Sequence, residues 1–123
     1  MNKSLLTVTA CAALAMLSAC QRAESPAEVR ADVADVQADR QEAVADALQD
    51  QSEVFADTAE AAASRDPDDR GDAIEDRAEA QYNTTMAAAQ GDLDIARQGC
   101  EGLSGNAQSA CKQAAEATYQ AKR

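Results

Sequence analysis

The sequence predicts an all-α fold in which one long amphipathic helix is followed by a disulfide-stapled helical hairpin, forming an elongated rod or a loose three-helix bundle. The chain has 123 residues, enough for one small domain. Alanine supplies about half of its hydrophobic residues, and aromatic residues make up only 2%. Alanine favours helix but buries little area, so helices are expected and a thick core is not. Apolar residues also recur at helical spacing along much of the chain.

The first helix is predicted to cover residues 26–64. Its start signal is strong, with Ser25 as the N-cap, Pro26 at the first helical position and Glu28 closing a capping box. No further proline and no glycine occurs before Pro67, so nothing in this stretch interrupts a helix.

Two faces of this helix differ sharply in polarity when each residue advances by about 100°. The apolar seam, an arc about 120° wide, consists of Val29, Val33, Val36, Val44, Leu48, Val54 and Phe55. The acidic ridge, an arc about 80° wide and centred nearly opposite, consists of Glu28, Asp32, Asp35, Asp39, Glu42, Asp46, Asp50, Glu53, Asp57 and Glu60. We expect the seam to pack on another helix, either within the chain or in a second copy. The ridge is expected to face solvent, and binding of cations or cationic peptides is its alternative role.

A second helix is predicted after a break at residues 64–71. Asp66 as N-cap followed by Pro67, and Asp72 as the N-cap of a capping box, are two alternative starts. The apolar positions of this helix, which form the second seam, are Ile74, Ala78, Tyr82, Met86, Ala89, Leu93 and Ala96. Gly91 is expected to be a weak point in it.

The second helix is expected to end around residues 103–106. Gly105 would lie past its last turn, and Asn106 would cap a short third helix over residues 107–121. The two C-terminal helices would then form an antiparallel hairpin.

Cys100 and Cys111 lie at equal distances on either side of this turn. Residues equidistant from the turn of a helical hairpin face each other, so the spacing favours a disulfide. A redox role and free thiols are the alternatives, although a catalyst would require CxxC spacing. Cys100 and Cys111 alone, in a chain with no histidine, do not suit a metal site, and no cofactor is predicted. The segment from Cys100 to Gly105, closing at Cys111, resembles a C-terminal pattern of small exported proteobacterial proteins of unknown function, which supports the hairpin and implies no activity.

The N-terminus has the features of an export signal. Lys3 gives a short positive start, an apolar run covers residues 5–17, and the small residues Ser18 and Ala19 follow. The run is too short to span a bilayer, which indicates a segment that is removed. The motif Leu17-Ser18-Ala19-Cys20 resembles the lipobox of bacterial lipoproteins. The alternative is an ordinary secretory signal in which Cys20 has no special role.

The lipobox resemblance implies a lipid anchor and an organisation for the chain. Signal residues 1–19 would be removed, Cys20 would carry diacylglycerol and a further acyl chain, and several chains together would hold the protein stably to a membrane. Residues 20–25 would form a lipidated tether before a helical domain at 26–123. Gln21 after the cysteine resembles the sorting signal for the outer membrane, so we expect a domain anchored there that faces the periplasm.

The charge and composition exclude several classes of function. The net charge is −11 and there is no tryptophan or histidine, so the chain repels phosphate backbones and nucleic acid is not an expected partner. Residues 66–77 superficially suggest a calcium loop, but Arg70 and Arg77 replace essential ligands, which excludes an EF-hand. The Arg70-Gly71-Asp72 triplet is interpreted as a chance adhesion motif. No nucleophile with an adjacent base is recognisable, so no catalytic residues are predicted.

These observations predict a non-enzymatic envelope lipoprotein with a structural or interaction role. Its partners would be the membrane, through the anchor, and an envelope protein or peptidoglycan. Two alternatives stay open. One is an acidic binding module, and the other is a peptidoglycan tether resembling the major outer-membrane lipoprotein, in which Lys122 would be the attached residue although Arg123 follows it.

Overall fold

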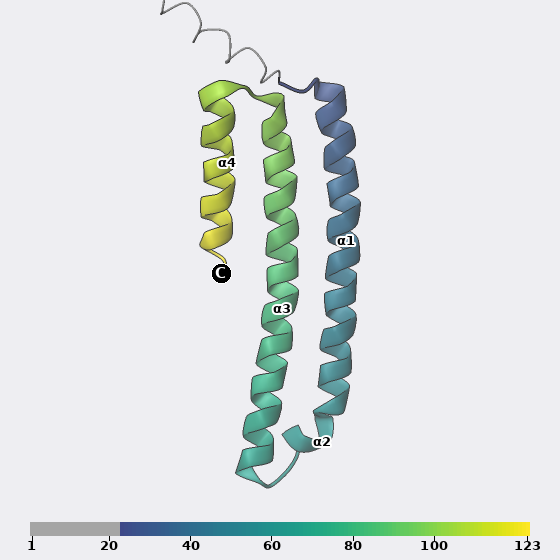
Figure 1. Cartoon of the computed structure of the whole chain (residues 1–123). Coiled ribbons are helices and arrows are strands. Elements are labelled where there is room, and N and C mark those ends of the chain that lie inside the picture. The colour runs from purple at the N-terminus through teal and green to yellow at the C-terminus, as the bar shows by residue number, and fades with distance from the viewer. Residues whose placement is uncertain (1–22) are drawn as a thin grey trace, which may run out of the picture.

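The computed structural model describes residues 23–123 of the chain, and every element of secondary structure in this part is a helix (Figure 1). The elements are α1 (Pro26–Asp57), α2 (Ala59–Ala62), α3 (Pro67–Gly99), a 3₁₀ turn (Cys100–Gly102) and α4 (Gly105–Gln120). The all-α fold class, with a long helix followed by a hairpin, is confirmed. The predicted signal peptide and the lipidation residue Cys20 lie outside the described residues.

Helices α1, α3 and α4 lie side by side in a row with α3 in the middle (Figure 1). α1 and α3 run antiparallel over most of their length, and α4 turns back along the C-terminal half of α3. Within residues 23–123, α1 and α4 make no contact with each other. The domain is therefore the elongated form of the predicted fold, and two of its helices are supported on one side only.

The start of α1 follows the predicted capping box. The Glu28 backbone N–H donates to Ser25 Oγ over 3.3 Å, and the Ser25 backbone N–H donates to Glu28 Oε2 over 2.8 Å. These reciprocal bonds satisfy two N–H groups that the first turn of a helix leaves without partners. The pKa of the Glu28 carboxyl is lowered, because the Ser25 side chain and the Ser25 backbone N–H both stabilise its charged form by hydrogen bonding.

The end of α1 differs from the prediction, because the helix breaks at Thr58 and does not continue to residue 64. The Thr58 hydroxyl donates back to the Val54 carbonyl over 2.6 Å, and Arg77 Nη2 donates to the Phe55 carbonyl over 3.1 Å. A threonine that bonds to the carbonyl four residues earlier tends to bend a helix. The single turn α2 then leads into the connection to α3 (Figure 1).

The hairpin helices begin and end at positions that correct several predictions. Of the two alternative starts for α3, the structure has Asp66 as N-cap, accepting from the Asp68 N–H over 3.0 Å, and Asp72 lies inside the helix. α3 ends at Gly99, earlier than expected. Gly105 lies past the end of α3, as expected, and is also the first residue of α4, with a φ of +57° that glycine adopts without strain. Asn106 is therefore within α4 and does not cap it.

The core is thin and consists mainly of small side chains. The buried residues of the described chain are Ala73, Ala80, Ala89, Leu93 and Cys100. The second seam is only half covered, since Ala89 and Leu93 are buried whereas Ile74 is 63% and Tyr82 49% exposed. The physical reason is the difference in length. α4 has 16 residues and α3 has 33, so α4 ends before it reaches the N-terminal half of α3, where Ile74 and Tyr82 lie (Figure 1).

The contact with α1 uses a different stripe of α3 from the second seam. Ala73 and Ala80 are buried seven residues apart, and the Thr84 hydroxyl next to this stripe donates to the Ala47 carbonyl of α1 over 3.1 Å. On α1, most of the apolar seam is partly buried as expected, but Leu48 is 51% exposed and lies outside the contact. The middle helix α3 thus has two apolar stripes, one for each neighbour.

Candidate binding groove between α1 and α3

The described residues just before α1 lie beside the α3–α4 turn. The Glu24 backbone N–H donates to the Glu101 carbonyl over 3.0 Å, and Gln98 Nε2 donates to carboxylate oxygens of Glu24 and Asp32, at 3.4 and 3.1 Å. Desolvation, together with the negative charges of Asp32 and Glu101, raises the pKa of the Glu24 carboxyl. Glu24 is therefore held against the α3–α4 end of the domain.

The predicted disulfide between Cys100 and Cys111 is present, with the two Cα atoms 5.8 Å apart. Cys100 is fully buried at the end of α3, and the bond joins it to the second turn of α4. Two ion pairs flank the bond, Arg97 with Glu116 and Lys112 with Glu101. The pair of cysteines is thus a structural link in the hairpin.

The C-terminal lysine is held against the domain. Lys122 Nζ and Arg40 Nε both donate to the Asp92 carboxylate, each over 2.9 Å. The hydrogen bond from Lys122 and the positive charge of Arg40 lower the pKa of Asp92 despite some desolvation. A single carboxylate on α3 therefore links α1 to the segment that follows α4.

Two sequence motifs have ordinary structural roles. Residues 66–77 form the start of α3 and not a loop, and no group of three or more histidine, cysteine or acidic residues suited to a metal ion occurs within residues 23–123. Arg70, Gly71 and Asp72 lie exposed in the first two turns of the same helix. An adhesion triplet in a loop conformation is not what the structure has at this position.

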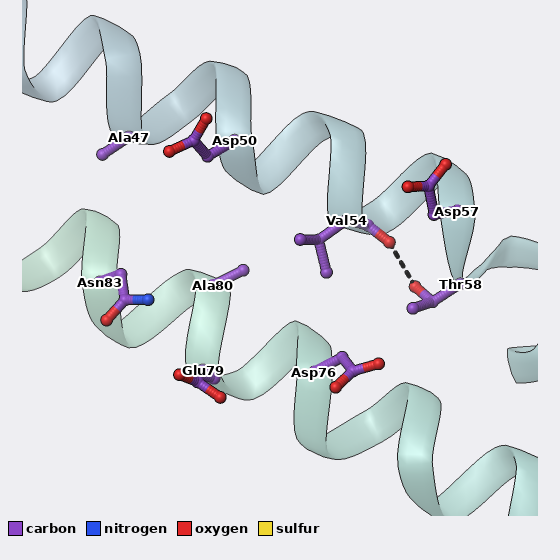
Figure 2. A pocket seen from close by; sticks show the side chains of 9 residues that line it. All are labelled: Ala47, Asp50, Val54, Asp57, Thr58, Asp76, Glu79, Ala80 and Asn83. Carbon is purple, nitrogen blue, oxygen red and sulfur yellow. Dashed lines mark hydrogen bonds between the residues drawn. The ribbon is translucent and has the colours of Figure 1, made fainter.

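The candidate site is a groove of about 370 Å³ between α1 and α3, near the α2 end of the domain. Figure 2 shows Ala47 and Val54 of α1 and Ala80 of α3 pointing into the space between the two helices. The remaining residues that line the groove are Asp50, Asp57, Thr58, Asp76, Glu79 and Asn83. The groove thus has an apolar floor and four carboxylates at its edges, two from each helix.

The polar groups at the groove differ in whether they already have partners. The Thr58 hydroxyl is engaged, since it donates to the Val54 carbonyl (Figure 2). It also accepts from Arg77 Nε over 2.8 Å. The four carboxylates take part in no ion pair and no side-chain hydrogen bond within residues 23–123, and no basic residue lines the groove. The groove is therefore chemically suited to bind a cation.

The sequence analysis identified only part of this site. Asp50 and Asp57 belong to the acidic ridge and are exposed to solvent as expected, and they also line one edge of the groove. Asp76 and Glu79 were not singled out, because their relation to α1 depends on how the two helices are aligned. Their spacing of three residues places both on one face of α3, which was the available signal.

Comparisons with known proteins assign the chain to no family. The chain matches no protein-family model, and the searches find no curated protein and no solved structure with significant similarity to it. Among the described residues, no helix combines the length and the apolar character that crossing a bilayer requires.

Proposed function

We propose that the protein is a non-enzymatic lipoprotein of the bacterial envelope, with a structural or interaction role. The observation that carries the proposal is the motif Leu17-Ser18-Ala19-Cys20 at the end of a short apolar run. The run has the features of a secretory signal, and the motif that closes it resembles the lipobox at which bacterial lipoproteins are acylated and cleaved. The mature chain would begin at Cys20 and be anchored to the outer membrane on its periplasmic side, in line with Gln21.

The geometry supports a defined orientation for an anchored domain. Glu24 is bound to the α3–α4 turn, four residues from Cys20, so this end would lie nearest the membrane. Helix α3 has 33 residues and spans about 50 Å at 1.5 Å per residue. The α2 end and the groove beside it would therefore project away from the lipid surface, where a partner could reach them.

The mass of the purified protein tests the anchor. We expect an intact mass that exceeds the polypeptide of residues 20–123 by the mass of the acyl groups. The Cys20→Ser variant should remain an uncleaved or unacylated precursor and should no longer partition into detergent as the wild type does. A wild-type mass equal to the bare polypeptide would contradict the proposal.

Separation of inner and outer membranes on a density gradient tests the location. The wild type should follow outer-membrane markers, whereas Gln21→Asp should move toward the inner membrane where the lineage uses that sorting rule. A protein released by washing the membranes without detergent would contradict lipid anchoring altogether.

The second candidate function is an acidic binding module, which the groove favours. Its unpaired carboxylates repel one another and would be neutralised by a bound cation. The protein should then gain thermal stability from a specific cation beyond the gain that sodium gives at matched ionic strength. Equal gains would leave only screening and would remove the support for this candidate.

A further inference from the structure

We propose that the groove between α1 and α3 binds a linear aliphatic polyamine, a chain of methylene groups that carries several ammonium charges. This inference rests on the acidic binding module proposed above as the second candidate function, and it does not depend on the lipid anchor. Three properties of the groove lead to it: its floor, its charges and its dimensions.

The floor of the groove is apolar. Methyl groups of Ala47 and Val54 from α1 and of Ala80 from α3 face the space between the helices (Figure 2). Hydrocarbon laid on such a surface is removed from water, which favours binding. A hydrated metal ion gains nothing from these methyl groups, whereas the methylene chain of a polyamine does.

The edges of the groove carry four negative charges without compensation from the protein. Asp50 and Asp57 lie on α1 and Asp76 and Glu79 on α3, with no basic residue among the lining groups. Elsewhere in the described chain, Arg40, Arg97, Lys112 and Lys122 already pair with acids away from the groove. Arg77 binds the Thr58 hydroxyl at one end of the groove but pairs with none of the four carboxylates, so a cationic ligand would complement them.

The carboxylates are spread along the groove and do not converge on a point. Asp50 and Asp57 are seven residues apart, which corresponds to about 10 Å along α1. In the described chain no group of three or more acidic, cysteine or histidine residues is placed to hold a metal ion. A calcium or magnesium ion needs converging oxygen ligands, whereas a polyamine carries separated charges that can each meet a carboxylate.

The size of the groove argues against a basic amphipathic helix as its ligand. An α-helix with its side chains is about 10 Å across. The groove between the two packed helices has a volume of only about 370 Å³, which leaves no room for a third helix inside it. That volume is at the lower end of the range for small-molecule sites. A basic amphipathic helix would lie on the surface without reaching the floor, so the small linear cation is the better fit.

Calorimetric titration of the purified full chain in non-ionic detergent, at constant ionic strength, tests the proposal with spermidine as the probe. The double variant Asp50→Asn/Glu79→Gln removes one charge from each edge of the groove. The matched control Asp35→Asn/Glu42→Gln removes two charges from the acidic ridge outside the lining. We expect spermidine affinity to fall about tenfold in the groove variant, as the loss of two exposed ion pairs implies, and to stay nearly unchanged in the control.

A second variant tests the floor without changing any charge. Ala47→Leu places a larger side chain in the groove and keeps all four carboxylates, so spermidine binding should weaken while the helical circular dichroism is retained. In the wild type, spermidine should also shift the NMR methyl signals of Ala47, Val54 and Ala80. Magnesium at the same concentration should produce neither the shifts nor competition.

The outcomes separate this inference from the binding module on which it rests. Equal loss of affinity in the groove and ridge variants, or displacement of spermidine by magnesium, would indicate a diffuse counterion layer and overturn both. Groove-dependent binding of a short oligolysine but not of spermidine would overturn the polyamine assignment and leave the binding module in place. Groove-dependent binding of spermidine with the methyl shifts would support both.

Discussion

Arg40 of α1 lies directly across the backbone of Gly91 of α3. A Cβ atom added at Gly91 would overlap the Cβ, Cγ and Cδ atoms of Arg40, so only glycine leaves room for this crossing. From there the guanidinium reaches Asp92, the next residue of α3. The glycine that weakens α3 by its low helix propensity thus allows the two long helices to approach and places the arginine for its ion pair.

Gly91→Ala should therefore destabilise the domain, although glycine-to-alanine changes inside helices usually stabilise. The propensity gain is about 1 kcal/mol, but the overlap involves the stem of Arg40 near its backbone and not a mobile tip. Overpacking of this kind costs about 1–3 kcal/mol. Urea unfolding followed by circular dichroism measures the difference.

Gly71→Ala is the matched control for this prediction, because it lies in the same helix and its Cβ would meet nothing within 4 Å. It should stabilise the domain by about 0.5–1 kcal/mol. If Gly91→Ala gave the same gain as Gly71→Ala, the close crossing of Arg40 would be refuted. Adding Arg40→Ala to Gly91→Ala should recover part of the loss.

The Asp92 carboxylate should make stability depend on pH in the acid range. Its pKa in the folded protein is lowered from the ordinary value of 3.8 by Lys122 and Arg40. A group with a depressed folded pKa contributes stability that is present above its unfolded pKa and is lost as the pH falls through the folded value. Asp92→Asn should thus reduce the melting temperature at pH 7 and have progressively less effect below about pH 4.

The side chains in this cluster are about half exposed, so we expect an effect of about 1 kcal/mol or less at neutral pH. Asp35→Asn, which removes a ridge carboxylate that has no ion-pair partner in the described structure, should leave stability unchanged or raise it slightly. A constant difference between Asp92→Asn and wild type from pH 7 to pH 2 would contradict the ion-pair assignment.

The sequence predicted those features of the fold that local chemistry determines. The start of α1 at Ser25 and one proposed start of α3 at Asp66 depend on capping groups within three residues, and both occur. The disulfide was predictable because the two cysteines are symmetric about a short turn. Helix ends were less predictable, since α1 breaks at Thr58 where Arg77, 19 residues away, binds the Phe55 carbonyl and the Thr58 hydroxyl.

The neighbours of each apolar face could not be predicted from periodicity. The second seam was identified correctly as one stripe, but the pattern does not reveal that α4 covers only Ala89 and Leu93 and leaves Ile74 and Tyr82 exposed. The same limit applies to the groove. Its acids lie on two helices, and their proximity depends on the alignment that the α1–α3 connection and the Arg40–Gly91 crossing impose.

Arg77 should stabilise the end of α1. Its guanidinium lies 5.3 Å from the centre of the Phe55 ring and donates to the Phe55 carbonyl and the Thr58 hydroxyl. Arg77→Ala removes a cation–π contact and two hydrogen bonds, so we expect a loss of about 1–3 kcal/mol. Hydrogen exchange should accelerate mainly in residues 55–62.

Arg70→Ala is the control for this position, since it removes the same charge from an exposed residue of the same helix. It should change stability by no more than about 0.5 kcal/mol. Equal exchange rates at residues 55–62 in Arg77→Ala and wild type would show that the α1 break is fixed by Thr58 alone.

The disulfide should decide whether α4 stays docked. This helix has 16 residues, contacts only α3 and the 3₁₀ turn within the described chain, and has no buried residue of its own, so its packing contributes little. Closing a loop with a separation of 11 residues contributes about 3 kcal/mol in the chain-entropy treatment. Reduction, or Cys100→Ser, should therefore accelerate hydrogen exchange across residues 104–123 while α1 and the N-terminal half of α3 keep their protection.

The Asp92–Lys122 ion pair should open when α4 separates from α3. The effect of Asp92→Asn on stability in the acid range should therefore be smaller in the reduced protein. Unchanged protection of α4 after reduction would show that its packing on α3, and not the covalent link, holds the hairpin together.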